Sequence, residues 1–187
     1  MDILQVKDRF SASIEASRGL KSGFLIGTTW DFECYDKDGN LKWEERNRPN
    51  IVTNEGLNHL LNVVFHGTTA FSPWYIGAVE SNTTAAATMT YATPVFTEWD
   101  GYTEAVRQEF VESAASSQSI TNSASKATFT SSEAMTLYGG ALFSYATMSD
   151  TAHAGAVLFC YSLFSSSKPV ENLDVFKITL TITASHS

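Results

Sequence analysis

The chain has 187 residues, of which 43% are hydrophobic and only 17% are charged, and its formal net charge is −8. The hydrophobic content excludes a wholly disordered chain, and the length is sufficient for one domain with its own core. The negative charge excludes a protein that coats nucleic acid, because binding to phosphates needs a basic surface.

The charged residues are concentrated in the first part of the chain. Up to Glu112 there are 9 basic and 16 acidic residues, whereas from Ser113 onward there are only 3 basic and 4 acidic ones. A weakly charged surface rich in Ser, Thr and Ala is common where a chain packs against copies of itself or a partner. The alternative is a β-domain that uses hydroxyl groups for solubility.

Nothing in the sequence indicates a membrane span or a secretion signal. There is no run of about 18 apolar residues, and the first ten residues, MDILQVKDRF, mix acids and bases where a signal peptide needs an apolar core. Cys34 and Cys160 lie far apart with no metal-binding spacing, so we expect both to be small buried side chains, with a disulfide between them left open. We therefore expect synthesis in a cytoplasm.

Residues 1–23 are predicted to form an N-terminal arm. Its apolar residues have loosely helical spacing: Ile3, Leu4, Val6, Phe10 and Ile14. The segment is too weakly patterned to build a core and too apolar for a solvated tail, so these five side chains are the candidates for an interface with a neighbouring chain. A frayed terminus is the alternative.

Residues 24–187 are predicted to form one mainly β domain that begins with a hairpin. Apolar and polar residues alternate over 24–45, and Asp38-Gly39 supplies the turn. The stretch 47–50, which contains Pro49, is expected to end the second strand.

One helix is predicted near 53–66. Thr53 or Asn54 can cap its start, and Gly67 can end it. An apolar stripe runs along one face and consists of Leu57, Leu60, Leu61, Val64 and Phe65.

Further short strands are predicted over the rest of the chain. They cover 74–79, 103–112, 124–130, 135–146, 156–164 and 175–183. Residues 80–94 are expected to be a long loop, and Gly139-Gly140 indicates a bulge. This pattern predicts an antiparallel β-sandwich, Ig-like or jelly-roll-like, with one inserted helix.

The sequence carries no recognisable catalytic motif. It lacks a nucleophile elbow, a P-loop and a zinc-protease helix, and no histidine has a partner at metal-ligand spacing. The stretch 36–40 resembles the start of a calcium loop but lacks the later ligands, so a hairpin turn is favoured. Glu98 and Asp100 could form the carboxylate pair of a glycosidase, although loop carboxylates are more often simply solvated. We expect no enzyme, no metal and no cofactor.

An aromatic pair is the candidate for sugar recognition. Trp99, in the segment WDGY, is the one tryptophan in a loop-like setting, and Tyr102 lies close to it in sequence. Trp30, Trp43 and Trp74 are expected to pack in the core or an interface. Trp99 and Tyr102 are therefore the candidate glycan contacts.

Several segments together resemble a known family. They are WDFECYDKDGNLKW (30–43), NIVTNEGLNHLL (50–61), WYIG (74–77), WDGYTEAVR (99–107), SASKATFT (123–130) and GGALF (139–143). Over roughly 30–183 the chain resembles small virion structural proteins of tailed bacteriophages, some of which are similar to capsid decoration or cement proteins. The arm before the first strand is an addition to the pattern of these relatives.

The resemblance implies a capsid decoration protein that bridges subunits of the major capsid protein on the outer surface of the virion. The net charge suits the outer side of a shell filled with DNA, and the weakly charged second half suits a homo-oligomer, with a trimer favoured. We expect no nucleic-acid or membrane partner. The alternative is a tail or baseplate component that binds glycans through Trp99 and Tyr102.

Overall fold

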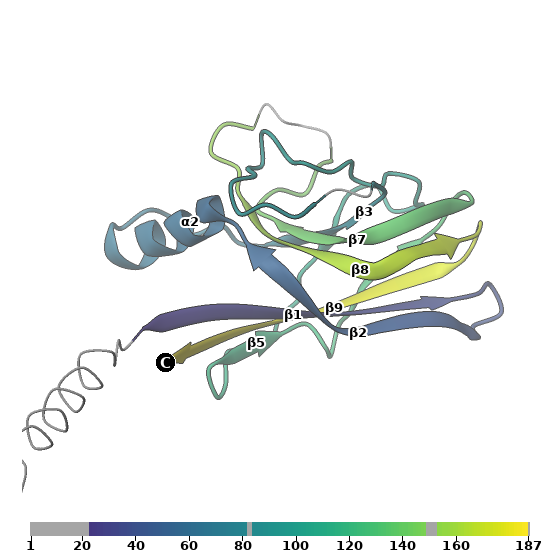
Figure 1. Cartoon of the computed structure of the whole chain (residues 1–187), viewed down its shortest axis with the longest axis horizontal. Coiled ribbons are helices and arrows are strands. Elements are labelled where there is room, and N and C mark those ends of the chain that lie inside the picture. The colour runs from purple at the N-terminus through teal and green to yellow at the C-terminus, as the bar shows by residue number, and fades with distance from the viewer. Residues whose placement is uncertain (1–22, 82–83, 149–152, 187) are drawn as a thin grey trace, which may run out of the picture.

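The computed structural model describes residues 23–81, 84–148 and 153–186. These residues form antiparallel strands and one helix (Figure 1). The elements are β1 (Phe24–Tyr35), β2 (Leu41–Val52), α2 (Asn54–Phe65), β3 (Tyr75–Val79), β4 (Gln108–Glu109), β5 (Ser119–Thr121), β6 (Ala127–Thr130), β7 (Met135–Phe143), β8 (Leu158–Val170) and β9 (Val175–His186). The candidate interface residues Ile3, Leu4, Val6, Phe10 and Ile14 lie outside the described residues.

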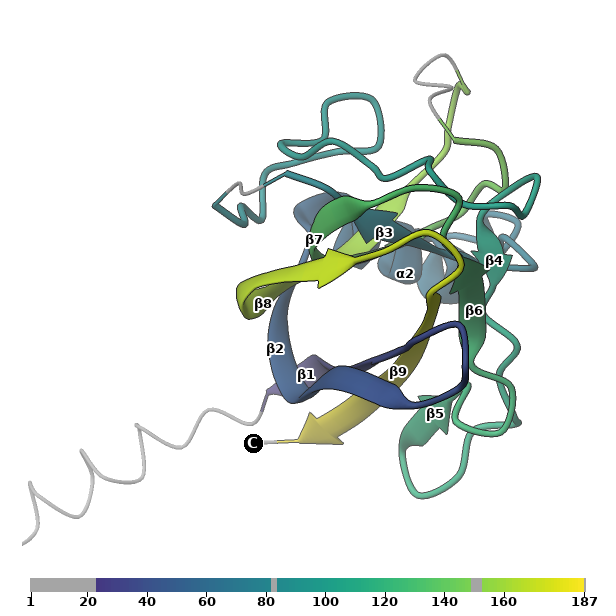
Figure 2. The ribbon, with the colours of Figure 1, turned by 90° about the vertical axis from the view of Figure 1, so that its right-hand side faces the viewer.

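The strands form a sheet in the order β4-β3-β7-β8-β2-β1-β9-β5, and β6 pairs with β9 as well. The sheet curls around its own core into a half-barrel, as the view in Figure 2 shows. The mainly β, antiparallel fold with one inserted helix that the sequence predicts is confirmed.

Aromatic side chains fill the inside of the curl. Trp30 and Phe32 on β1 are fully buried, as are Phe129 on β6 and Phe176 on β9. The rings of Phe32 and Phe176 stack with their centroids 6.0 Å apart. The alternation of apolar and polar residues along β1 therefore corresponds to one face turned into this core.

The predicted hairpin is confirmed, but its second strand is longer than expected. The Asp36 carboxylate accepts the backbone N–H groups of Asp38 and Asn40, which closes the turn. The expectation that residues 47–50 end the strand is wrong: β2 bends at Asn47, which has a φ of 53°, and continues to Val52. The bend lets β2 leave β1 and pair with β8 from Asn50 onward, so the proline marks a change of partner.

Two other strand predictions need correction. The strand predicted over 103–112 is reduced to β4. Before β4, the backbone N–H of Thr103 donates to the carbonyl oxygen of Thr130, and the Glu104 carboxylate accepts the N–H of Thr130. The short strand β5 lies between the strands predicted over 103–112 and 124–130, where no strand was expected. The bulge at the double glycine is confirmed by a register shift between Leu137 and Gly139, where a Cβ would overlap the carbonyl oxygen of Ser162.

The predicted start of the helix is also confirmed. Thr53 Oγ1 accepts the N–H of Gly56 at 2.9 Å and donates to the carbonyl oxygen of Leu158 at 2.5 Å. The cap thus both begins the helix and anchors it to β8. No helix among the described residues is long and apolar enough to cross a membrane.

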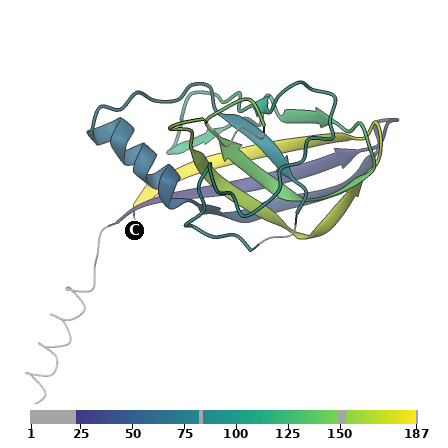
Figure 3. The same ribbon diagram turned by 90° about the horizontal axis from the view of Figure 1, so that it is seen from above.

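The apolar stripe of α2 is largely exposed. Figure 3 shows that the helix projects from one end of the sheet. Its first turn packs on β8 through Gly56, which is buried, whereas the later turns extend beyond the sheet. The exposed fractions are 38% for Leu57, 51% for Leu61, 60% for Val64 and 81% for Phe65. The expected amphipathic helix exists, but little of its apolar face is covered by the described residues.

Candidate functional site

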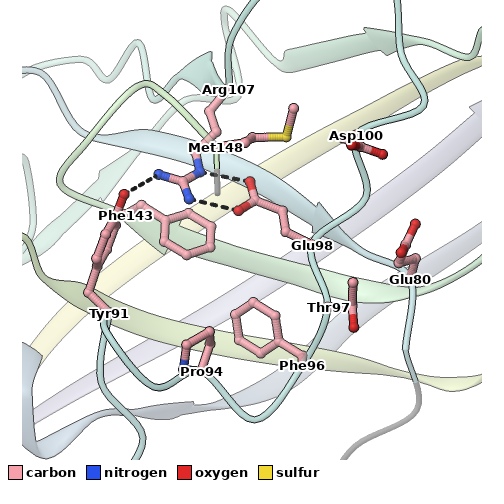
Figure 4. Close-up of a pocket in the computed structure, with 10 residues that line it drawn as sticks. All are labelled: Glu80, Tyr91, Pro94, Phe96, Thr97, Glu98, Asp100, Arg107, Phe143 and Met148. Atoms are coloured by element: carbon pink, nitrogen blue, oxygen red, sulfur yellow. Dashed lines mark hydrogen bonds and ion pairs between the residues drawn. The ribbon is translucent and has the colours of Figure 1, made fainter. Parts of the chain in front are cut away.

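The long segment between β3 and β4 forms a cavity over the outer side of β7. The cavity has a volume of about 460 Å³. Carboxylates lie on one side of it and aromatic rings on the other (Figure 4). It is lined by Glu80, Tyr91, Pro94, Phe96, Thr97, Glu98, Asp100, Arg107, Phe143 and Met148.

A buried ion pair supports the wall of this cavity. Arg107, only 4% exposed, donates from Nε and Nη2 to the two carboxylate oxygens of Glu98, each at 2.7 Å. Its Nη1 donates to the carbonyl oxygen of Tyr145 at 2.6 Å and to the hydroxyl of Tyr91 at 3.2 Å. The guanidinium carbon also lies 3.8 Å from the ring centroid of Phe143. Through these contacts Arg107 holds the loop residues Glu98 and Tyr91 against Phe143 of β7.

The two partners influence each other's ionisation. Burial raises the pKa of the Glu98 carboxyl, and the hydrogen bonds and charge of Arg107 oppose that rise. Burial lowers the pKa of Arg107, but Glu98 outweighs burial and leaves it above its ordinary value. Both oxygens of Glu98 are therefore occupied by a cation that stays charged.

The open side of the cavity is acidic. Burial raises the pKa of Glu80, and the charges of Asp100 and Glu133 add to the rise. In residues 23–81, 84–148 and 153–186 no group of three His, Cys, Asp or Glu side chains could hold a metal ion. The accessible carboxylates can accept hydrogen bonds from hydroxyl or ammonium groups of a ligand.

The structure does not place the predicted aromatic pair on the surface. Trp99 is fully buried and Tyr102 is 7% exposed. The backbone N–H of Trp99 donates to the carbonyl oxygen of Ala78, which holds the loop against β3. The indole ring lies in the core beside Phe129. Trp99 lies in a loop between β3 and β4, as expected, but its ring is buried and has no free face for stacking on a sugar, so the expected glycan contact is wrong.

The two carboxylates of the predicted glycosidase pair, Glu98 and Asp100, have different environments. Glu98 is held by Arg107, whereas Asp100 is exposed. Sequence reasoning missed Arg107 and Tyr91, because their contacts with each other, with Glu98 and with Tyr145 join separate parts of the chain. A single Arg flanked by apolar and acidic residues, as in EAVRQEF (104–110), was the one available signal.

Both cysteines are buried and free of a disulfide bond. Burial raises the pKa of the Cys34 thiol to about 12, and the charge of Asp174 adds to the shift. Burial also raises the pKa of Cys160. The expected role as small buried side chains is confirmed.

Comparison with known proteins identifies the class of protein first. Residues 52–183, more than two thirds of the chain, match a family model of phage proteins, and the mainly β domain is accordingly that of a bacteriophage structural protein found in virions. The chain belongs to the family described as podophage GP4 fiber I protein gp80. No curated protein matches the chain.

Proposed function

We propose that this chain is a fiber component of a phage virion and acts by self-association and binding. The observation that carries the proposal is the family match over residues 52–183. This assignment corresponds to the tail-component alternative of the sequence analysis. Capsid decoration, the first expectation from the sequence, is the competing proposal, supported by the net charge of −8.

Copy number separates the two roles. Quantitative mass spectrometry of purified virions, calibrated against the major capsid protein, should find far fewer copies of this chain than of the shell subunit. Gold-labelled antibodies should then mark fibers. A copy number close to that of the major capsid protein, with label spread over the head, would support decoration and overturn the fiber proposal.

We also propose that the domain is not an enzyme. Glu98 is the most buried carboxylate of the cavity, and both of its oxygens accept hydrogen bonds from Arg107. A general acid must carry a proton toward its substrate. Hydrolysis of host polysaccharide by the purified protein, abolished in Glu98→Gln, would contradict this.

A second proposed function is glycan binding at the cavity. A cavity lined by both accessible carboxylates and apolar rings is suited to sugar hydroxyls and sugar faces, and here Glu80 and Asp100 line the same cavity as Phe96 and Pro94 (Figure 4). Saturation-transfer NMR with host surface polysaccharide should give signals that fall several-fold in Asp100→Asn and Phe96→Ala. Lys37→Ala, at the exposed hairpin turn, is the control. Equal signals in all variants would exclude this cavity.

A further inference from the structure

The first residues of β1 have an unpaired edge. Phe24–Thr28 pair with β9 on one side, from Phe24 opposite His186 to Thr28 opposite Ile182. On the other side, pairing with β2 begins only at Thr29, opposite Pro49. No strand among the described residues covers this edge, so backbone groups of every second residue face outward along it.

An apolar groove lies along the same edge. It has a volume of about 480 Å³ and lies between residues 24–28, the end of β2 and the first turns of α2. Leu25, 54% exposed, and Leu57, 38% exposed, both line it. A strand that paired with the edge could therefore place alternate side chains on apolar surface.

Among the described residues this end of the molecule carries few charges, one of them being Glu112 near Ile120 and Ile182. Residues 24–30, 113–125 and 179–186 contain no Asp, Glu, Lys or Arg, and α2 contains only Glu55. The Oε2 atom of Glu55 accepts the N–H groups of Tyr91 and Leu158, each at 2.8 Å. In Figure 1 the starts of β1 and α2, together with β5 and the C-terminus, lie at the left, opposite the hairpin turn. Exposed apolar residues without charges are typical of a protein interface.

We propose that this groove binds residues 3–7 of a neighbouring copy as an added β-strand. The segment Ile-Leu-Gln-Val-Lys contains apolar residues suited to the groove, with Leu4 and Val6 two residues apart on one face of a strand. Residues 8–23 can span roughly 50 Å when extended, which is ample to reach the next molecule. The chain enters the domain at Phe24, beside the groove, so each copy gives a strand next to the place where it receives one.

A neighbouring copy is the better donor on geometric grounds. Within one copy, residues 8–23 would have to loop back beside the groove before residues 3–7 could pair with the strand that follows them. Between copies no reversal is needed. The inference deepens the self-association in the proposed function, but its tests use purified protein, so it can fail while the fiber assignment stands.

Binding can be tested with a peptide and a deletion variant. Sedimentation velocity should show an oligomer for the full chain and a monomer for a variant lacking residues 1–22. A labelled peptide of residues 1–14 should bind the deletion variant in fluorescence anisotropy, whereas a scrambled peptide should not. Leu25→Glu and Leu57→Glu should weaken binding at least tenfold, and Leu41→Glu, 51% exposed but at the hairpin end, should not. Unchanged binding in the groove variants would overturn the proposal.

Disulfide trapping shows whether the strand in the groove comes from a neighbouring copy or from the same chain. Leu4→Cys and Leu57→Cys variants, mixed under mild oxidation, should give a covalent dimer of one copy of each, and Leu4→Cys mixed with Leu41→Cys should not. A double Leu4→Cys/Leu57→Cys variant that closes within one chain, with no dimer from the mixture, would show that the segment binds its own groove and would overturn exchange between copies. Absence of any specific trapping would refute docking at this groove.

Discussion

The buried pair of Glu98 and Arg107 is the residue-scale contact whose loss should matter most. The Glu98 side chain is 12% exposed in the natural chain, and Arg107→Ala would remove the cation that both of its oxygens contact. Removing one partner of such a pair costs about 3–5 kcal/mol, because the other charge stays buried. We expect a loss of this size in the free energy of unfolding, measured by urea denaturation.

A double variant separates charge burial from packing. Glu98→Leu with Arg107→Leu removes both charges, so it should lose clearly less stability than Arg107→Ala alone. A single variant as stable as the natural chain would show that the pair does not hold the loop.

Glu33 should make stability depend on pH. The side chain is 4% exposed, and its oxygens accept hydrogen bonds from Lys126 at 2.9 and 3.0 Å and from Arg46 at 2.5 Å. Burial raises its pKa, but Lys126 and Arg46 outweigh burial and leave it below the ordinary value. The folded state binds the Glu33 proton less tightly than the unfolded state does, so ionised Glu33 stabilises the fold. This stabilisation is fully present above the unfolded pKa of about 4.3 and is lost as the pH falls through the folded pKa.

The measurement is urea unfolding at a series of pH values between 7 and 3, a range set by the carboxyl pKa. Glu33→Gln should be less stable than the natural chain at pH 7, and the gap should close toward pH 3. Glu109→Gln, an exposed control, should follow the natural chain throughout. A gap that stays constant over the whole range would contradict the assignment.

Single-residue burial could be predicted on the strands but not in the loops. Alternation along β1 indicates which residues face inward, and Trp30 and Phe32 are buried accordingly. The burial of Trp99 depends on where the 80–108 segment crosses β3, which no local pattern encodes. Arg107 was missed for the same reason, since its partners Glu98 and Tyr145 come from other parts of the chain.

At the scale of elements, Gly56 controls how α2 packs on β8. A Cβ at this position would lie 2.7 Å from the carbonyl oxygen of Phe159, a backbone atom that cannot move away easily. Ala is favoured over Gly in a helix by about 1 kcal/mol. We nevertheless expect Gly56→Ala to lower the free energy of unfolding, because the steric overlap displaces the helix from the strand.

The control lies on the same helix. Asn58 is exposed, so Asn58→Ala should leave stability unchanged or raise it slightly through helix propensity. Thermal unfolding followed by circular dichroism compares the two variants. Gly56→Ala melting above the natural chain would show that α2 does not pack as tightly as described.

The elements that were predicted correctly are those with local signals. Thr53 as a cap and Gly67 as a stop correctly located the two ends of the helix in the sequence, and Asp38-Gly39 correctly located the hairpin turn. The periodicity of α2 showed an apolar face but not what would cover it, because that depends on the sheet that the helix meets. Likewise Pro49 indicated an interruption, whereas the change of partner from β1 to β8 is a property of the whole sheet.

At the scale of the whole molecule, charged residues are concentrated at the hairpin end, and the opposite end has few charges and more exposed apolar residues. The hairpin end carries Asp36, Lys37 and Asp38, whereas the end with α2 exposes Leu61, Val64 and Phe65. The low charge noted in the second part of the sequence thus contributes, through residues 113–125 and 179–186, to one end of the fold. Copies that associate through this end would keep their charged ends apart, which limits repulsion between chains of net charge −8.

This arrangement predicts how self-association responds to salt. Contacts between uncharged apolar surfaces are not weakened by screening, while the repulsion between acidic copies is reduced by it. The association constant of the full chain, measured by sedimentation velocity at increasing NaCl concentrations, should therefore stay constant or rise. Leu61→Glu should lower it at every concentration, because a buried unpaired charge is costly at an interface. Association that weakens steadily with salt would instead require an interface held by charged residues, such as those of the hairpin end.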